Sequence, residues 1–353
     1  MKSRSFGIDL LKSVSMMMIV TLHVLGVGGI LAGTSTGTAA NYAAWFLETM
    51  NMCAVNCFGL ISGYVLCKGH YRRSRLLSLW LRVVFEALII TAAFAAFKPS
   101  VIGLKEWFLA VTPVVHNVYW YFTAYFALFF FVPYINKMIA SLSSKQMASL
   151  AVSVVFIFTF MANISPNDIY HLHGGYGFLW LLCLYVLGAC LRHLKVKDTI
   201  NKYWFLFAYF MCVTVSWALM YLLNSQAVIA YTSPFILFSA VFLLLFFRRL
   251  DFKSEFFKKT ISMLSRTSFG VYIIHTNPLI WVYFLTGRFV SYLNYALPIT
   301  LIAVIFSAAI IYSVCTLGDW LSEKFFKLIR IDLLEKAVDN IGNSRKSQNA
   351  LLK

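Results

Sequence analysis

The sequence predicts an all-α membrane protein, a polytopic bundle of about ten transmembrane helices with both termini in the cytosol. Of its 353 residues, 61% are hydrophobic and only 12% are charged, which is about half the charged fraction of a typical soluble domain. Apolar stretches of at least about 18 residues recur along the chain, and each is long enough to cross a bilayer as a helix. Lysine and arginine gather in alternate connecting segments, the pattern that sets the orientation of such helices.

Ten spans are expected where these apolar stretches fall, in chain order 9–30, 44–66, 76–97, 119–136, 147–163, 174–191, 203–223, 230–247, 267–285 and 299–318. With the N-terminus inside, the segments expected in the cytosol hold 25 of the 30 lysines and arginines. The formal net charge of +17 is therefore explained by topology and by attraction to anionic lipids. Nucleic-acid binding is not expected.

The domain organisation is expected to be simple. Residues 1–320 are expected to form one membrane domain, and residues 321–353 a cytosolic tail that is amphipathic or disordered. The inside segment 247–266 alternates basic and aromatic residues, which is typical of a helix lying on the inner leaflet. The outside segment 98–118 is moderately apolar and is expected along the membrane interface. No internal repeat is visible, which does not favour an inverted-repeat transporter.

The first span carries the most informative polar residues. Lys12 and His23 are eleven residues apart, a spacing that turns a helix by about 1100° and advances it by about 16 Å. Both side chains therefore lie on one helix face, which they share with Met16, Ile19 and Gly26. Taken singly, Lys12 is expected to reach lipid headgroups and His23 to bond a neighbouring helix. Together on one face, with Asp9 one turn before Lys12, they favour a functional path into the membrane.

The second span is unusually polar. Glu48 is interpreted either as an acceptor-binding or proton-handling carboxylate at the outer end of a cavity, or as a residue of the membrane interface. The small residues Gly59, Ser62 and Gly63 would let the backbone of another helix approach closely. Packing is therefore the role expected of these small residues.

Basic residues follow the second span in the stretch KGHYRRSR. Arg72 and Arg75 could belong to the positive-inside pattern alone, or their guanidinium groups could bind phosphates at the mouth of a cavity. Arg82 and Glu86 are four residues apart in the third span, and we expect them to pair on one helix face.

Aromatic residues and further histidines mark the later spans. Trp120 and Tyr121 begin the fourth span and are explained by an aromatic belt at the interface. His275 lies inside the ninth span and ranks second to His23 as a functional histidine. His171 and His173 sit in a predicted surface loop, where two ligands without a partner carboxylate make no convincing metal site.

Taken in order, these residues resemble the motifs of the acyltransferase 3 family, which contains bacterial membrane O-acyltransferases. Asp9, Lys12 and His23 match the family's Asp–x–x–basic start and its basic residue eleven positions before a histidine. The usual cation is arginine, and Lys12 keeps the charge but lacks the bidentate fork. The other matches, in chain order, are Phe58 with Ser62, Gly63 and Tyr64 (with one extra residue), Arg72 with Arg75, Trp120 and Tyr121 with Pro133, and Tyr272 to His275.

The resemblance implies transfer of an acetyl group from cytosolic acetyl-CoA to a hydroxyl of a surface or secreted polysaccharide, or of its lipid-linked precursor. The catalytic residues would be His23, as the general base, and Lys12, as the cation at the cytosolic mouth of the donor path. CoA would be bound by Arg72, Arg75, Trp120 and Tyr121, and the substrate-binding candidates are Asp9, Glu48 and His275.

The same resemblance sets the expected partners and location. Acetyl-CoA would be the donor, and neither a permanently bound cofactor nor a metal is expected. The partners would be the glycan acceptor, the bilayer and glycan-assembly proteins, in the cytoplasmic membrane of a bacterium. The stand-alone form of the family, without an extracytoplasmic esterase-like domain, is expected.

Two other classes of function remain open from the residues. A transporter of a sugar, an amino acid or a lipid-linked glycan would use His23 and Glu48 as polar groups of its site. A non-catalytic membrane partner in a glycan-assembly complex would tolerate the loss of both His23 and Lys12.

Overall fold

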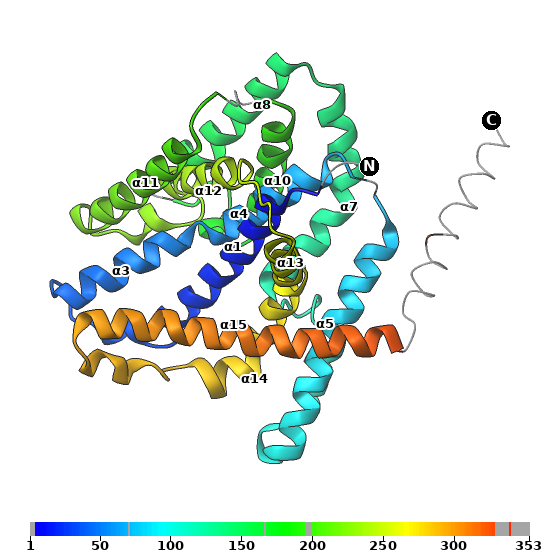
Figure 1. The fold of residues 1–353 in the computed structure, drawn as a ribbon, viewed down its shortest axis with the longest axis vertical. Coiled ribbons are helices and arrows are strands. Elements are labelled where there is room, and N and C mark those ends of the chain that lie inside the picture. The colour runs from blue at the N-terminus through cyan, green and yellow to red at the C-terminus, as the bar shows by residue number, and fades with distance from the viewer. Residues whose placement is uncertain (1–3, 70, 166, 195–198, 329–338, 340–353) are drawn as a thin grey trace.

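The computed structural model describes residues 4–69, 71–165, 167–194, 199–328 and 339. Over these residues the chain is all-α and contains no strand, which confirms the predicted fold class (Figure 1). The long helices are α1 (Phe6–Leu25), α3 (Ala39–Met52), α4 (Ala54–Leu66), α5 (Arg73–Phe97), α7 (Trp120–Ser141), α8 (Ser144–Val155), α10 (Phe178–His193), α11 (Lys202–Leu222), α12 (Pro234–Phe247), α13 (Glu255–His275) and α15 (Leu297–Leu328). Short helices join them, namely α2 (Ile30–Gly33), α6 (Leu104–Val111), α9 (Ala162–Ile164) and α14 (Pro278–Ile280).

The structure supports a multi-pass membrane protein. Within the described residues, eight helical stretches are long and apolar enough to cross a membrane, and they fall on eight of the ten predicted spans. The sixth predicted span is the shorter apolar helix α10, of 16 residues. The ninth falls partly on α13, whose first half is charged. Ten spans and cytosolic termini therefore stay predictions.

Helix α13 corrects one sequence prediction. A separate helix over 247–266 is not formed, because residues 248–254 are not helical and α13 then runs unbroken from Glu255 to His275. No proline interrupts this stretch, so the basic–aromatic segment and the start of the ninth predicted span become one helix. The helix ends just before Pro278, since the residue preceding a proline disfavours helical backbone angles.

The C-terminal boundary of the predicted membrane domain falls inside a helix. Helix α15 continues through residue 320 to Leu328, so no break in the helix marks the predicted boundary at residue 320. Most of the expected tail, residues 329–338 and 340–353, lies outside the described residues. The outside segment 98–118 contains α6.

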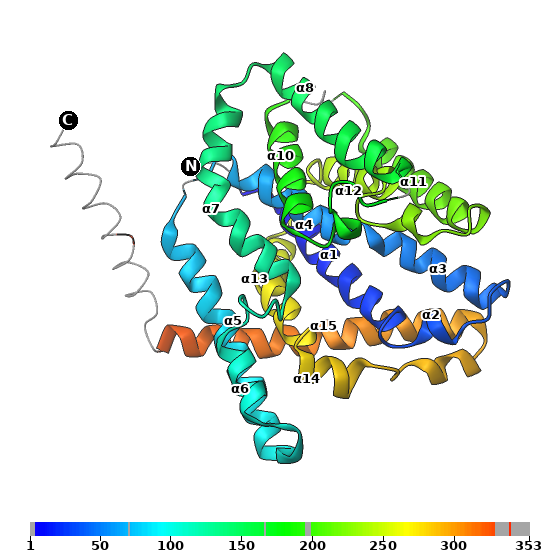
Figure 2. The ribbon, with the colours of Figure 1, turned by 180° about the vertical axis from the view of Figure 1, so that it is seen from behind.

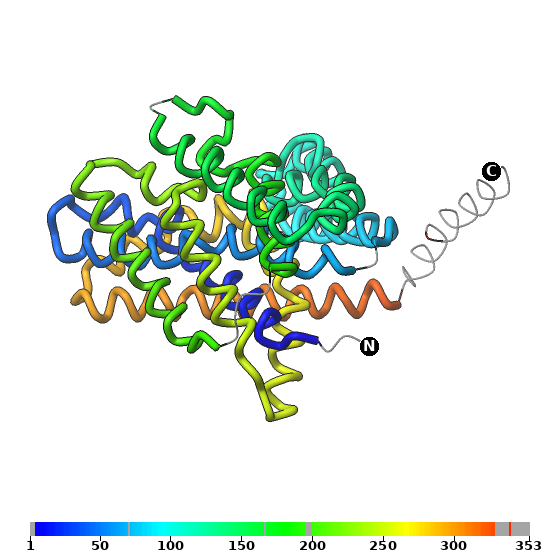
Figure 3. Tube along the Cα trace, turned by 90° about the horizontal axis from the view of Figure 1, so that it is seen from above, coloured from blue at the N-terminus to red at the C-terminus, as the bar shows by residue number. Residues whose placement is uncertain are grey.

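Helix α1 lies at the centre of the bundle. It contacts α3, α4, α12, α13 and α15, and Figures 1 and 2 show it between the α3–α4 pair and α15. Seen from above in Figure 3, α15 runs along the length of the molecule. Helices α13 and α15 also contact each other. The polar face of α1 is thereby enclosed by helices that come from distant parts of the chain.

Small residues bring α4 and α10 into direct backbone contact. A Cβ atom added at Gly63 would overlap the carbonyl oxygen of Tyr185, and one added at Gly188 would overlap that of Leu60. The close approach that the sequence predicts for the second span is therefore confirmed at Gly63. In lipid the hydrophobic effect does not drive helices together, so close packing of this kind supplies the attraction between them.

Replacing Gly63 with alanine is expected to lower the free energy of unfolding by about 1–3 kcal/mol, since α10 must shift to admit the methyl group. Gly177→Ala is the matched control, because its backbone is extended and an added Cβ would meet no atom of the described residues within 4 Å. Equilibrium unfolding in mixed micelles measures both variants. Equal unfolding free energies would contradict the close approach of α4 to α10.

Candidate functional site

A cavity of about 840 Å³ runs along α1. Its wall includes Ile8 near the start of α1 and Gly26 just after its end. The 18 helical steps between them rise roughly 27 Å, close to the thickness of the hydrocarbon core, about 30 Å. The cavity is therefore nearly as long as the membrane is thick.

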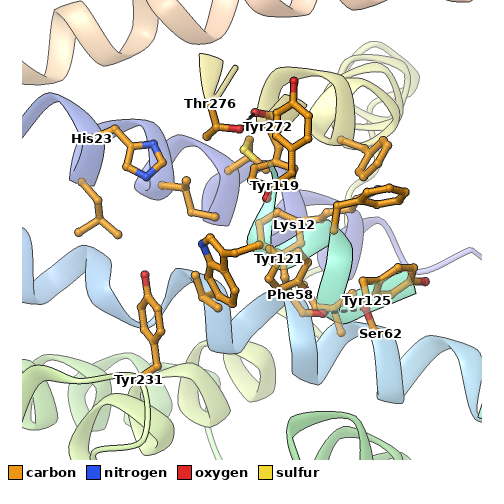
Figure 4. Close-up of a pocket in the computed structure, with 18 of the residues that line it drawn as sticks. Lys12, His23, Phe58, Ser62, Tyr119, Tyr121, Tyr125, Tyr231, Tyr272 and Thr276 are labelled. Atoms are coloured by element: carbon orange, nitrogen blue, oxygen red, sulfur yellow. Dashed lines mark hydrogen bonds between the residues drawn. The ribbon is translucent and has the colours of Figure 1, made fainter. Parts of the chain in front are cut away.

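The predicted polar face of the first span forms one wall of this cavity. All five residues placed on that face line it, namely Lys12, Met16, Ile19, His23 and Gly26. Figure 4 shows His23 and Lys12 apart from each other along α1. Helical periodicity thus predicts correctly that these side chains share one face. It does not predict which residues lie across the cavity from them.

Lys12 is available to bind an anion. Within the described part of the chain it makes no hydrogen bond or ion pair, although the charges of Asp9, Arg82 and Asp319 lie near it. Asp9, its expected neighbour, is engaged elsewhere, because its carboxylate pairs with Arg4 and accepts a hydrogen bond of 3.2 Å from Ser265 Oγ. The ammonium group of Lys12 therefore lies on the cavity wall, and no carboxylate of the described residues is bound to it.

The structure brings the two membrane histidines together. His23 Nδ1 lies 2.9 Å from His275 Nε2, although the residues are 252 positions apart in the sequence. His275 is 0% exposed and lies behind His23 rather than on the cavity wall. The ring of Trp281 packs edge-on against His23, with the ring centroids 4.6 Å apart. His23 thus lines the cavity, and its hydrogen bond to the buried His275 holds the orientation of its ring.

Glu48 lies on the cavity wall beside an aromatic cluster. Its Oε2 is buried and has no hydrogen-bond partner among the described residues. The rings of Trp120, Tyr176 and Tyr231 also line the cavity and pack on one another, with Tyr176 centroids 4.8 Å from each of the other two. A carboxyl oxygen that has no partner among the described residues can accept a hydrogen bond from a hydroxyl group, and ring faces can contact apolar C–H groups.

The two arginines expected to bind CoA lie outside the cavity wall. Arg72 immediately precedes α5, and its Nε donates a hydrogen bond of 3.0 Å to the carboxylate of Asp339. Ser74 Oγ donates to the same carboxylate at 2.8 Å. Arg75 is exposed in the first turn of α5. The cavity thus gathers Asp9, Lys12, His23, Glu48, Trp120 and Tyr121, but not Arg72 or Arg75.

A buried ion pair near the cavity differs from the sequence prediction. Arg82 pairs with Asp319 of α15 and not with Glu86 on its own helix. The side chain of Asp319 is 0% exposed, and α13 admits it because residue 270 is a glycine whose missing side chain leaves it room. Sequence reasoning missed Asp319 because it lies just beyond the predicted end of the tenth span.

The loop histidines lie away from this cavity. His171 and His173 are exposed, and the backbone N–H groups of Leu172 and His173 donate to the carboxylate of Asp168, which shapes the loop. In the ranges that the structure describes, no group of three or more His, Cys, Asp or Glu residues is placed to hold a metal ion.

Comparison with known protein families gives a match over most of the chain. Residues 5–317 match the model of a family described as an acyltransferase domain. The matched range spans nearly the whole chain. The matched range contains every residue that lines the cavity. No curated protein and no solved structure matches the chain.

Proposed function

The chain belongs to the acyltransferase 3 family, and on that basis we propose that it moves an acetyl group from cytosolic acetyl-CoA to a hydroxyl of a surface or secreted polysaccharide, or of its lipid-linked precursor. Membership of the family supports a membrane acyltransferase. The acetyl donor, the glycan acceptor, the histidine base and a bacterial cytoplasmic membrane are the parts that we propose.

One observation carries the proposal most directly. A single cavity joins the ammonium of Lys12, which pairs with no carboxylate of the described residues, to the imidazole of His23, about 16 Å farther along α1. An extended, flexible arm such as the pantetheine of CoA suits a narrow path of this length. The membrane-depth cavity therefore supports a reaction that draws its donor from one membrane surface and its acceptor from the other.

The donor end would use cations and aromatic side chains. Lys12 would attract the anionic or carbonyl oxygens of the donor, and Tyr121 and Trp120 line the wall along which the donor arm would lie. Arg72 and Arg75, at the start of α5, would bind CoA phosphates outside the cavity. Arg72 already binds a carboxylate in the structure, which supports an affinity for anions at that place.

The reaction itself needs one base. As the acceptor hydroxyl oxygen attacks the thioester carbonyl, His23 Nε2 would take its proton. The new C–O ester bond forms, the C–S bond breaks, and CoA leaves as a thiolate, which takes the proton from the His23 imidazolium and returns the base to its neutral form. Glu48, Tyr176 and Tyr231 would hold the acceptor, since a carboxyl group and ring faces suit a sugar.

Glycan analysis tests this function. A strain in which the gene is deleted is compared with its parent, and the deleted strain is expected to lose O-acetyl esters from its surface or secreted glycan, measured by mass. Purified protein in nanodiscs should transfer label from radiolabelled acetyl-CoA to glycan isolated from the deleted strain. Identical glycan masses in both strains would contradict the proposal, and solute movement without acetyl-CoA would favour a transporter.

A further inference from the structure

We propose that His275 is a positioning residue that fixes the tautomer of His23 and so exposes a basic ring nitrogen to the cavity. This inference rests on the proposed function, because it concerns the base of that reaction. His275 does not line the cavity and would not touch the substrate. It would act only through its hydrogen bond to His23.

The tautomer of His275 is set by its own helix. Its Nδ1 lies 2.5 Å from the carbonyl oxygen of Val271, and a carbonyl oxygen can only accept a hydrogen bond. Nδ1 of His275 must therefore carry the proton. In the neutral ring, Nε2 is then the unprotonated nitrogen and can only accept.

The tautomer of His23 is set in turn by His275. Because His275 Nε2 accepts, His23 Nδ1 must be the donor across the 2.9 Å that separate them. The proton of the neutral His23 ring is thus held on Nδ1, and Nε2 keeps its lone pair. Nε2 has no hydrogen-bond partner within the part of the chain that the structure describes, and the ring lines the cavity.

This arrangement matters because the free imidazole favours the opposite tautomer. A histidine side chain in water carries its proton mainly on Nε2, and a ring in that form presents the cavity with a donor instead of a base. The two hydrogen bonds that link Val271 to His275 and His275 to His23 reverse this tautomer preference in His23. They also help after proton transfer, since a hydrogen bond from an imidazolium is roughly twice as strong as a neutral one and charge at membrane depth is costly.

Two substitutions at position 275 separate the proposed role from folding. In His275→Asn the amide can still donate to Val271, but it is too short to reach His23. In His275→Gln the longer side chain can place an acceptor oxygen near the former position of Nε2. We expect His275→Asn to lower kcat by roughly 10- to 100-fold, as for loss of a residue that orients a functional imidazole, with the KM for acetyl-CoA unchanged. His275→Gln should retain most of the lost rate.

Thr267→Val is the matched control. It removes another buried hydrogen bond from a side chain to a backbone carbonyl of α13, two turns from His275 and without contact to His23. Its kcat should equal that of the unaltered protein. Equal losses in His275→Asn and His275→Gln would overturn the proposal, because a merely structural role does not distinguish them.

A spectroscopic measurement tests the tautomer without any need for activity. Nitrogen-15 NMR of histidine-labelled protein in nanodiscs distinguishes protonated from unprotonated ring nitrogens, and the His23 signals are assigned from their absence in His23→Gln. We expect protonated Nδ1 and unprotonated Nε2 in the unaltered protein, and the reverse in His275→Asn. An Nε2-protonated ring in the unaltered protein would overturn the inference. If the protein proved not to acetylate glycans but gave the expected spectrum, the proposed function would fail and the inferred tautomer of His23 would still hold.

Discussion

Replacing His23 with alanine is expected to lower the rate constant for acetyl transfer by roughly 10²- to 10⁴-fold, the usual contribution of a positioned general base. The reason is geometric, since His23 is the imidazole that lines the cavity while its Nδ1 is bound to buried His275. The KM for acetyl-CoA should change little, because Lys12 lies about 16 Å away along the helix. Label transfer from radiolabelled acetyl-CoA in nanodiscs measures both constants.

Two comparisons make this test specific. His116→Ala removes an exposed imidazole that does not line the cavity, and its activity should equal that of the unaltered protein. Added imidazole should restore part of the activity of His23→Ala, because the truncation leaves room on the cavity wall where the ring stood. Unchanged acetylation in cells that contain His23→Ala at the normal level would rule out His23 as the base.

The sequence predicts those features of the site that a single helix determines. The face shared by Lys12 and His23 follows from helical periodicity, and the structure confirms it because all of its residues line one cavity. The close approach at Gly63 follows equally from local chemistry, since a missing side chain invites a neighbouring backbone. The fold class follows from hydropathy alone.

Features that depend on which helices become neighbours were not predictable in this way. Nothing in the spacing of His23 indicates a partner 252 residues later. Helical periodicity predicts Glu86, on the same helix, as the partner of Arg82. In the fold its partner is Asp319 of α15. The charged first half of α13 hides its continuity with the ninth predicted span, because hydropathy averages over a window and ignores which face each charge occupies.

The aromatic cluster near Glu48 was likewise not predictable from single helices. Trp120 is explained by an interface belt when α7 is considered alone, but in the fold it packs against Tyr176 and near Tyr231 from two other segments. Contacts of this kind arise only when segments distant in sequence are brought together. The part of the cavity wall around Glu48 therefore depends on the fold, whereas the face that carries Lys12 and His23 is a property of α1 alone.

Replacing Asp319 with alanine is expected to lower the free energy of unfolding by about 3–5 kcal/mol, the cost of breaking a buried ion pair from one side. The side chain of Asp319 is 0% exposed and that of Arg82 is 22% exposed, so the guanidinium would be left largely buried without its partner. The charge of Lys12 lies close enough to affect the same region, which adds a repulsion once the carboxylate is gone. Equilibrium unfolding in mixed micelles measures the effect.

A control and a double variant show whether burial is the cause. Glu323→Ala removes a carboxylate four residues later on α15, where it pairs with Lys327 at 3.2 Å in a more exposed place, and it should cost no more than about 1 kcal/mol. Arg82→Met combined with Asp319→Leu should be more stable than Asp319→Ala alone, because neither the unpaired charge of Arg82 nor its repulsion of Lys12 remains. If the double variant were instead the least stable of the three, the ion pair itself, and not the avoidance of a lone buried charge, would be what holds α5 to α15.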